Sequence, residues 1–324
     1  MLLSLLACTQ SAGPGFPDPE AVLIHHELAK LEDTQVEGLE LVFGGTGTLS
    51  TDADRAGSSI AVLAGDQVLL FDCGPGSTRV LGSSGVALGQ VSGVFVTHLH
   101  SDHYGDLGEL TIATEILGRE EALVVWGPEG IDSVARGYEM AMAPDHANRA
   151  TQHPGHLHEA AARLETRPLE EGVVYEQDGL VVRAFPVDHR PVEEAWAFRI
   201  EYEDSSVVLS GDTAWHEPLA EFAQGADVLV HEAMDKDLAE KVAVVADERG
   251  QERTAALVRD ALVNHSTAGE AADIARLAGV DTLVLTHISP PLKAPHLRRR
   301  FKRQATEVFE GEVLLARDGM TLKL

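Results

Sequence analysis

Four potential metal ligands within six residues constrain this chain more than any other feature. His98, His100, Asp102 and His103 directly follow the apolar run 94–97, whose composition is typical of a β-strand. A strand that ends in a short loop holds its side chains at fixed angles, so His98 and His100 can share one metal. Asp102 and His103 lie on the turn and can reach a second metal. Imidazole and carboxylate ligands together suit Zn²⁺ or a similar ion. The alternative is a polar loop whose histidines are only solvated, but chance rarely produces this spacing.

Two metals need more ligands than this loop supplies, and further candidates follow other short β runs. They are His189, Asp212 and His287, each directly after an apolar segment with β character. Loops at strand ends are the usual place for active sites in α/β sheets. Taken alone, each residue could equally be a hydrogen-bonded polar group. The need of the first loop for partners favours all three as ligands.

The positions of these motifs favour a single large domain. Candidate functional motifs run from residue 44 to residue 287, and a division of the 324 residues into two domains would separate ligands that must meet. Apolar residues make up 44% of the chain, which is ample for a core. The two cysteines, Cys8 and Cys73, do not suggest a disulfide framework.

Further motifs identify the chain as similar to the metallo-β-lactamase fold superfamily of dinuclear metal hydrolases. Residues 42–48 resemble the glycine-rich strand and turn that open this fold, and residues 70–74 resemble its second hairpin. The segments 231–233 (His-Glu-Ala) and 265–268 (His-Ser-Thr-Ala) resemble motifs of the ribonuclease Z, arylsulfatase and phosphodiesterase branches, and far less those of β-lactamases. The resemblance extends from about residue 39 to residue 324.

The resemblance implies a centre with two divalent metals, most simply Zn²⁺, with Mn²⁺ as the alternative. Three histidines would bind one ion, an aspartate and two histidines would bind the other, and a second aspartate would bridge both. In that order, the residues at these positions are His98, His100 and His189; Asp102, His103 and His287; and Asp212. A hydroxide bridging the two metals would be the nucleophile, because metal binding lowers the pKa of water. Asp102 could orient it.

The resemblance also implies a proton donor for the leaving group, His265. Glu232 could hydrogen-bond its other ring nitrogen and set its tautomer. The structural alternative is that His265 only precedes a helix, which Ser266 or Thr267 would cap. Both interpretations can hold together.

The substrate separates several functional hypotheses. Ribonuclease Z proteins typically carry a basic arm that binds tRNA and a long Gly/Pro-rich segment between the third histidine and the bridging aspartate. Here His189 and Asp212 are only 23 positions apart (212 − 189), and the net charge of −27 repels nucleic acid. We therefore expect hydrolysis of small anionic esters, of the arylsulfatase or phosphodiesterase type, and no nucleic-acid partner. The alternatives are a ribonuclease Z-like tRNA 3′ endonuclease, a lactonase or β-lactamase-type hydrolase, and a catalytically inactive metal-binding protein.

Residues that could contact the substrate are less well defined. Residues 127–162 read as an irregular helical insertion over the site, and Asp145 and His146 are its candidates to reach the substrate. Arg190 and Trp215 follow ligands in the chain and are weaker candidates. The one dense basic run, 298–303, reads as a solvated face of a C-terminal helix.

The N-terminus resembles the end of a bacterial lipoprotein signal. Leu5 and Ala7 stand at the expected positions before Cys8, the candidate for lipidation, although a basic start is missing. Residues 1–20 would then be a leader and tether, and the protein would be exported to the periplasm or anchored to a membrane. The alternative is a terminal segment without structure on a cytoplasmic protein. The oligomeric state is left open between a monomer and a homodimer.

The order of expected elements predicts the architecture. Two β-rich halves flanked by helices suit a four-layer αβ/βα sandwich, of the α/β (α+β) class, over residues 21–324, with the metals at one sheet edge. We expect strands at 39–43, 59–64, 67–71, 94–97, 122–126, 228–230, 282–286 and 313–316, a β series within 164–209, and helices at 107–117, 268–278 and 295–309.

Overall fold

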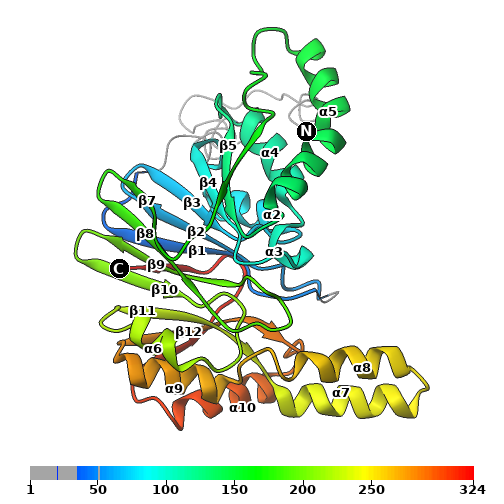
Figure 1. Cartoon of the computed structure of the whole chain (residues 1–324), viewed down its shortest axis with the longest axis vertical. Coiled ribbons are helices and arrows are strands. Elements are labelled where there is room, and N and C mark those ends of the chain that lie inside the picture. Colours follow the sequence, from blue (N-terminus) through cyan, green and yellow to red (C-terminus); the bar gives the residue numbers. More distant parts are fainter. Residues whose placement is uncertain (1–19, 21–34, 50–51) are drawn as a thin grey trace, which may run out of the picture.

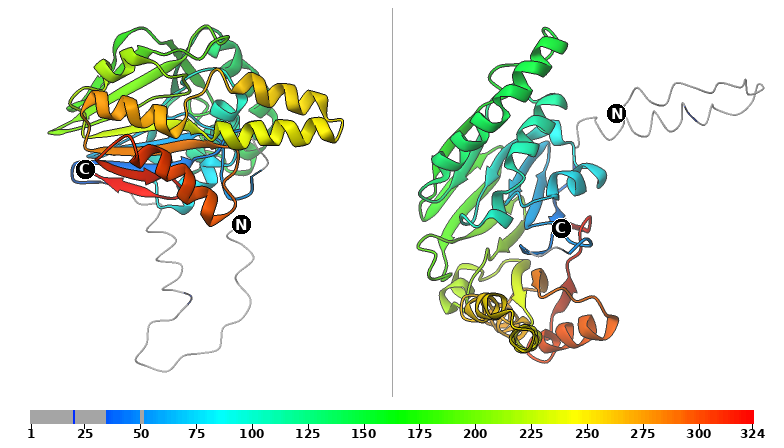
Figure 2. Two further views of the ribbon diagram at one scale, coloured as in Figure 1. Left: turned by 90° about the horizontal axis from the view of Figure 1, so that it is seen from below. Right: turned by 90° about the vertical axis from the view of Figure 1, so that its right-hand side faces the viewer.

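The computed structural model describes residues 20, 35–49 and 52–324. Within this part, two seven-stranded sheets pack face to face and helices cover their outer faces (Figure 1, Figure 2). The predicted four-layer αβ/βα sandwich is therefore confirmed. Residues 1–19 of the predicted leader and tether, with Cys8, lie outside the described residues.

The first sheet mixes antiparallel and parallel strands. β14, β1, β2 and β3 pair antiparallel, whereas β3 to β6 pair parallel. In sheet order the strands are β14 (Thr321–Lys323), β1 (Leu39–Gly45), β2 (Ser59–Ala64), β3 (Gln67–Phe71), β4 (Val91–Phe95), β5 (Leu123–Gly127) and β6 (Leu164–Pro168). Every residue of β2 and β3 is buried, which explains why both read as continuous apolar runs.

The second sheet has the same number of strands and a similar mixture. β7 to β10 pair antiparallel, and β10 to β13 pair parallel. In sheet order the strands are β13 (Glu312–Leu315), β12 (Thr282–Ser289), β11 (Val228–Met234), β10 (Ser205–Leu209), β9 (Trp196–Tyr202), β8 (Leu180–Pro186) and β7 (Gly172–Gln177). Parallel strands place their carboxyl ends at one edge, where the loops that carry the candidate ligands begin.

Helices occupy the two outer layers. The first sheet is covered by α2 (Ser77–Ser83), α3 (Ser101–Tyr104), α4 (Leu107–Ile116) and α5 (Ile131–Gln152), and the second by α6 (Glu217–Phe222), α9 (Ala268–Ala278) and α10 (Pro295–Thr306). A short 3₁₀ turn lies at Leu88–Gln90. A pair of helices, α7 (Lys236–Glu248) and α8 (Glu252–Ala261), projects from the body as a hairpin (Figure 1). None of the described helices combines the length and apolarity needed to cross a lipid bilayer.

Stacked aromatic rings join the two sheets at the centre of the core. Phe95 stacks on Phe71 with ring centroids 5.0 Å apart and on Trp126 with centroids 4.5 Å apart. Phe198 of the opposite sheet meets Phe95 edge-on at 5.6 Å. Such pairs add about 0.5–1.5 kcal/mol each beyond the burial of their area. They fix β4 against the second sheet directly before the loop that begins at residue 96.

Most expected elements agree with the structure, although several begin or end at other residues. The strands at 59–64 and 67–71 and the helix at 268–278 have the predicted bounds. The strand expected at 94–97 instead ends at Phe95. The reason is that the Thr97 N–H donates to the Asp72 carboxylate (2.8 Å) and so leaves the sheet. The region 127–162 contains α5, but nothing tests its predicted role as a lid.

Candidate metal centre

The predicted ligands converge at one edge of the sandwich, on loops that follow four strands. His98 and His100 lie in the loop after β4, and Asp102 and His103 lie in α3. The remaining ligands lie on the second sheet: His189 after β8, Asp212 after β10 and His287 near the end of β12. The two halves of the chain therefore contribute to one site, as a single domain requires.

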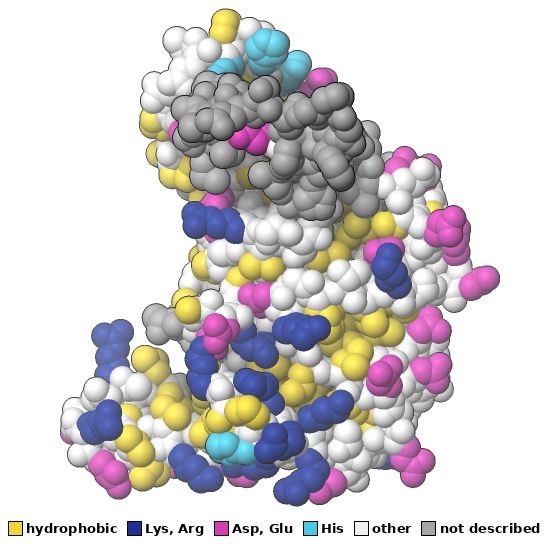
Figure 3. Space-filling view, turned by 180° about the vertical axis from the view of Figure 1, so that it is seen from behind, with side chains coloured by type: hydrophobic (Ala, Val, Ile, Leu, Met, Phe, Trp, Pro, Cys, Tyr) yellow, Lys and Arg dark blue, Asp and Glu magenta, His cyan; other side chains and the backbone are white. Residues whose placement is uncertain are grey.

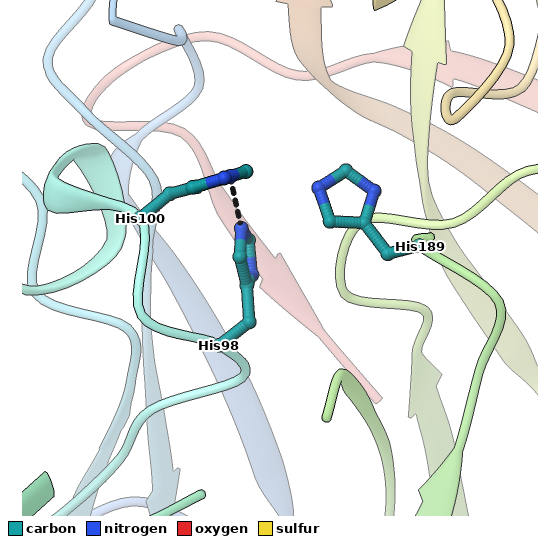
Figure 4. A group of neighbouring side chains, drawn as sticks. All are labelled: His98, His100 and His189. Atoms are coloured by element: carbon teal, nitrogen blue, oxygen red, sulfur yellow. Dashed lines mark hydrogen bonds between the residues drawn. The ribbon is translucent and has the colours of Figure 1, made fainter. Parts of the chain in front are cut away.

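Three histidines form the first group, shown in Figure 4. Candidate ligand atoms of His98, His100 and His189 all lie within 4.8 Å of one another. The His98 and His189 ring centroids are 4.8 Å apart, and the His100 ring lies 5.3 Å from that of His189. His98 Nε2 lies 2.8 Å from His100 Nδ1. Three converging imidazoles of this kind are a typical zinc ligand set.

The second group combines a carboxylate with two histidines. Asp102 Oδ2 lies 3.4 Å from His287 Nε2 and 3.9 Å from His103 Nε2. Burial raises the pKa of the Asp102 carboxyl, but the His287 hydrogen bond and the charge of His103 outweigh this and lower the pKa to about 2. Asp102 is therefore a carboxylate at neutral pH, the form that binds a cation.

Asp212 lies between the two groups. Its Oδ2 atom is 3.3 Å from His103 Nε2, 3.4 Å from His287 Nε2 and 3.9 Å from His98 Nε2. One carboxylate oxygen thus faces both ligand groups, which suits the predicted bridging role. The preceding Gly211 has φ +60°, and a Cβ there would meet a backbone oxygen at 2.4 Å, so only glycine allows this approach.

Buried nitrogens without hydrogen bonds support divalent metal binding at this site. His103 Nε2 and His189 Nε2 are buried and make no hydrogen bond to any described residue. Their other ring nitrogens are occupied, because His103 Nδ1 lies 2.7 Å from the Asp72 carboxylate and His189 Nδ1 lies 2.9 Å from the Asn264 carbonyl oxygen. An acceptor on Nδ1 places the proton there and leaves the Nε2 lone pair for a metal. The residues present therefore fit a two-metal centre.

Asp72 is a functional residue that the sequence reasoning did not assign. Its carboxylate accepts hydrogen bonds from the Thr97 N–H (2.8 Å) and hydroxyl (3.1 Å) and contacts His103. It has φ +61°, an uncommon conformation for a residue other than glycine, and strain of this kind gathers at functional sites. The signal was present, because Asp72 lies in the motif 70–74 directly after a buried strand.

His265 and Glu232 pair beside the ligands as predicted. Glu232 Oε1 lies 3.1 Å from His265 Nδ1 and also accepts the Ser266 N–H (2.9 Å) and the Thr213 N–H (3.3 Å). Burial lowers the pKa of His265, but the negative charge of Glu232 outweighs this and raises the pKa to about 9. His265 Nδ1 is 4.0 Å from Asp212 Oδ2, so the ring borders the metal-ligand group.

The residues after His265 also cap a helix, which was the structural alternative for this segment. Thr267 caps α9: its hydroxyl accepts the Glu270 N–H, and the Glu270 carboxylate accepts the Thr267 N–H. This reciprocal arrangement is a capping box. It fixes the N-cap of α9 two residues after His265, so the helix cap also positions the imidazole. Of the two predicted caps, Thr267 is therefore the one used, whereas the Ser266 hydroxyl donates to the Thr213 carbonyl oxygen (2.8 Å).

The four predicted substrate contacts are not brought together at the ligands. Asp145 forms an ion pair with Arg149 on α5, and His146 lies 3.0 Å from Glu115, beside a separate cavity. Arg190 is exposed and pairs with Asp188, and the Trp215 indole donates to Asp273. No contact given for the described residues joins any of the four to a ligand, so their substrate role stays a prediction.

A cavity of about 460 Å³ lies beside the ligand group on the first sheet's side. Asp102 contributes to its wall, together with the loop that contains Arg55 and Gly57. Asp318 holds this loop by accepting the Thr46 hydroxyl (2.7 Å) and the Ala56 N–H (2.6 Å). The sequence did not identify Arg55 as a residue near the site, because only the fold brings its loop to Asp102.

Comparisons with known proteins agree with this geometry. Residues 67–288 match the family model described as "Beta-lactamase superfamily domain". Ribonuclease Z of Mycobacterium sp. (strain KMS) is 38% identical over 282 residues, which cover 86% of this chain and 94% of that protein. Ribonuclease Z of Mycobacterium bovis (strain BCG / Pasteur 1173P2) is 36% identical over 290 residues, which cover 86% and 96%.

Solved structures share the fold at lower identity. The metallo-β-lactamase fold protein YhfI from Bacillus subtilis matches with a TM-score of 0.65 and 21% identity, over 89% of this chain and all of that one. The short form of human tRNase Z (ELAC1) matches with a TM-score of 0.62 and 23% identity, over 88% and 98%. At these identities the structural matches establish the fold alone.

Proposed function

The chain belongs to the beta-lactamase superfamily of metallo-β-lactamase fold hydrolases, and from this premise we propose that it is a ribonuclease Z-type phosphodiesterase that cleaves tRNA precursors at the 3′ end. One observation carries the proposal. Relatives named Ribonuclease Z share 36–38% identity over 86% of this chain and over 94–96% of their own length. Similarity at this level over nearly whole chains favours a shared reaction over a shared fold alone.

This proposal corrects the expectation from sequence in two respects. Hydrolysis of sulfate esters has no support among these relatives. The expected absence of a nucleic-acid partner rested on the net charge of −27 and on the short interval between His189 and Asp212. The ribonuclease Z relatives argue against that expectation, because net charge describes the average field and not the surface around the site.

The side chains of the centre suit cleavage of a phosphodiester with a poor leaving group. Divalent metals held by the seven ligands would supply Lewis-acid chemistry and positive charge for an anionic ester. Asp102 is ionised and can accept a hydrogen bond from an attacking water. His265, whose pKa is raised, carries a proton at neutral pH and can donate it to the departing alkoxide oxygen. Glu232 accepts from Nδ1, which leaves Nε2 of His265 as the donor towards the substrate.

A small phosphodiester is the second candidate substrate. The acidic composition and the compact connection between His189 and Asp212 favour it. In this case the same residues would act on a small ester without contacts to an extended polymer. The two candidates differ in substrate length, not in chemistry at the reacting phosphorus.

The test is a substrate panel with a matched inactive variant. A tRNA precursor with a 3′ trailer, bis(p-nitrophenyl) phosphate, p-nitrophenyl sulfate and a lactone are each incubated with Zn²⁺ or Mn²⁺, with and without a chelator. We expect chelator-sensitive cleavage of the precursor and of the phosphodiester. Asp212→Ala should bind less metal by elemental analysis and cleave neither. A protein that hydrolyses the nitrophenyl phosphodiester but leaves the precursor intact would refute the tRNA assignment.

A further inference from the structure

Residues 282–306 differ in charge from the rest of the chain. The protein has 52 acidic and 25 basic residues, yet this stretch of 25 residues contains no Asp or Glu and holds six of the basic ones. The stretch includes β12 with the ligand His287, a connecting loop and α10. The positive charge therefore begins within a few residues of the metal centre.

Side-chain exposure separates the cations of α10 into two groups. Phe301 and Ala305 are fully buried against the second sheet and α9. Four cations of α10 have exposed side chains. These residues, which we call the α10 basic face, are Arg298, Arg299, Lys302 and Arg303. Arg300 is less exposed and pairs with the buried carboxylate of Asp235.

The α10 basic face has little charge compensation of its own. Arg299 and Lys302 have no ion pair with any residue that the structure describes. Arg303 pairs with Glu307 at 3.5 Å, but both side chains are about two-thirds exposed, and such pairs contribute little. Figure 3 shows Lys and Arg side chains gathered over this part of the molecule. In a protein with a net charge of −27, such a surface is expected to attract an anionic partner locally.

The loop before α10 contacts the cavity that Asp102 borders. Lys293, in the loop before α10, pairs with Asp52 and with Asp54 (2.9 Å), which joins α10 to the loop of Arg55. Arg298 lies close enough to Arg55 that, after burial, its positive charge contributes to lowering the pKa of that guanidinium. Arg55 lines the 460 Å³ cavity together with Asp102. Asp52, the partner of Lys293, lines the same cavity, so the segment before α10 contacts the wall of the cavity that Asp102 borders.

We propose that the α10 basic face binds the phosphate backbone of the RNA substrate and holds the scissile bond in the cavity at Asp102. This inference rests on the proposed function, because it takes the anionic polymer to be RNA. Arginine guanidinium groups bind phosphate oxygens in a bidentate manner, and lysine adds a point charge. The surface replaces the basic arm that the sequence lacks, and it does so without changing the acidic character of the rest of the chain.

The test compares two double variants that remove the same charge. Arg299→Ala/Lys302→Ala removes one Arg and one Lys from the basic face. The control, Arg253→Ala/Lys241→Ala, removes one Arg and one Lys from the projecting α7–α8 hairpin, where both side chains are exposed and form no ion pair with described residues. Binding of a tRNA precursor is measured at 50 and 200 mM salt, apart from cleavage, and bis(p-nitrophenyl) phosphate hydrolysis reports on the metal centre.

Loss of two phosphate contacts should reduce the slope of log K against log [salt] by about 1.4–1.8. Between 50 and 200 mM salt, the variant should therefore lose about tenfold less affinity than the wild type. We expect RNA affinity at 50 mM salt to fall about tenfold in the α10 variant alone, with unchanged hydrolysis of the small phosphodiester. An equal loss in the control, or unchanged RNA affinity, overturns the proposal. Binding to anionic lipid vesicles is measured in parallel. If the α10 variant loses vesicle binding but keeps its RNA affinity, the proposal is also overturned.

The design separates failure of this inference from failure of the proposed function. If the wild-type protein binds the precursor through α10 but does not cleave it, the basic face stands and the tRNA-processing assignment falls. If it cleaves the precursor and the α10 variant cleaves and binds equally well, the assignment stands and the basic face is wrong.

Discussion

The pairing of Glu232 with His265 predicts that Glu232 affects the rate of hydrolysis only through His265. Glu232→Gln should slow hydrolysis of an alkyl phosphodiester, and the effect should vanish when His265 is absent. The reason lies in the contacts of Glu232 Oε1, which accepts His265 Nδ1 at 3.1 Å and two backbone N–H groups. A glutamine oxygen can keep both backbone bonds, so the variant removes mainly the negative charge beside the imidazole.

The magnitude follows from the strength of that contact. A hydrogen bond to a charged group contributes about 1.5–3 kcal/mol, against about 1 kcal/mol for a neutral one. The difference, about 0.5–2 kcal/mol, corresponds to roughly a 2- to 30-fold slower reaction. His265→Ala should cost about 10²–10⁴-fold, the usual contribution of general acid catalysis. In that background, Glu232→Gln should change the rate by less than about twofold.

The assay is a double-mutant cycle with two substrates. Rates for an alkyl phosphodiester and for bis(p-nitrophenyl) phosphate are measured for the wild type, both single variants and the double variant. The nitrophenyl ester should respond weakly throughout, because its leaving group departs without a proton. Thr267→Ala is the matched control. It disturbs the cap beside His265 without altering the charge there, so it measures the cost of disturbing the loop alone. Additive effects of Glu232→Gln and His265→Ala would refute the dependence, and equal losses on both esters would refute the proton-donor role.

Three further predictions concern residues that support the site. Asp72→Asn should weaken metal binding about 10–100-fold in competition with a chelator, because it removes the carboxylate on His103 Nδ1; unchanged affinity would show that Asp72 has no such role. Thr267→Ala should lower the free energy of unfolding by about 1 kcal/mol in urea, through loss of the α9 cap. Although burial raises the pKa of Glu270, its hydrogen bonds to Thr267 and the charge of Lys236 lower the pKa below the usual 4.5, so its stabilising effect is present above pH 4.5 and is lost on further acidification. Glu270→Gln should remove that part of the acid sensitivity, and an unchanged pH profile would contradict it.

The ligands could be predicted from the sequence because their chemistry is local. His98, His100, Asp102 and His103 are close in the chain, so their spacing alone indicated a metal-binding site. Strand bounds were predictable where both faces are buried, since a continuous apolar run has little freedom to end elsewhere. The pairing of Glu232 with His265 came from resemblance, and the 3.1 Å contact agrees with it.

Other features depend on tertiary contacts that no local pattern encodes. Thr97 reads as the end of a strand because threonine favours β structure, but the Asp72 carboxylate takes its N–H and ends β4 two residues earlier. Strand β14 is three residues long, and its pairing partner, β1, lies about 280 positions away. Both depend on contacts between segments that are distant in sequence.

The ribonuclease Z relatives argue against the expectation that no nucleic acid is bound, and the reason for the difference lies in how charge acts. Net charge sums the whole chain, whereas a binding surface is set by which side chains the fold leaves unpaired and exposed on one face. The run 298–303 reads as a solvated helix surface in sequence, because nothing there shows that Arg300 turns to the buried Asp235 while Arg299 and Lys302 face solvent without partners among the described residues. Salt screens exposed charges over about 10 Å at 0.1 M, so a phosphate at α10 responds to those nearby cations more than to acidic residues on the far side of the molecule. An acidic protein can therefore bind RNA at one face, and the salt dependence of that binding reports the local cations and not the total charge.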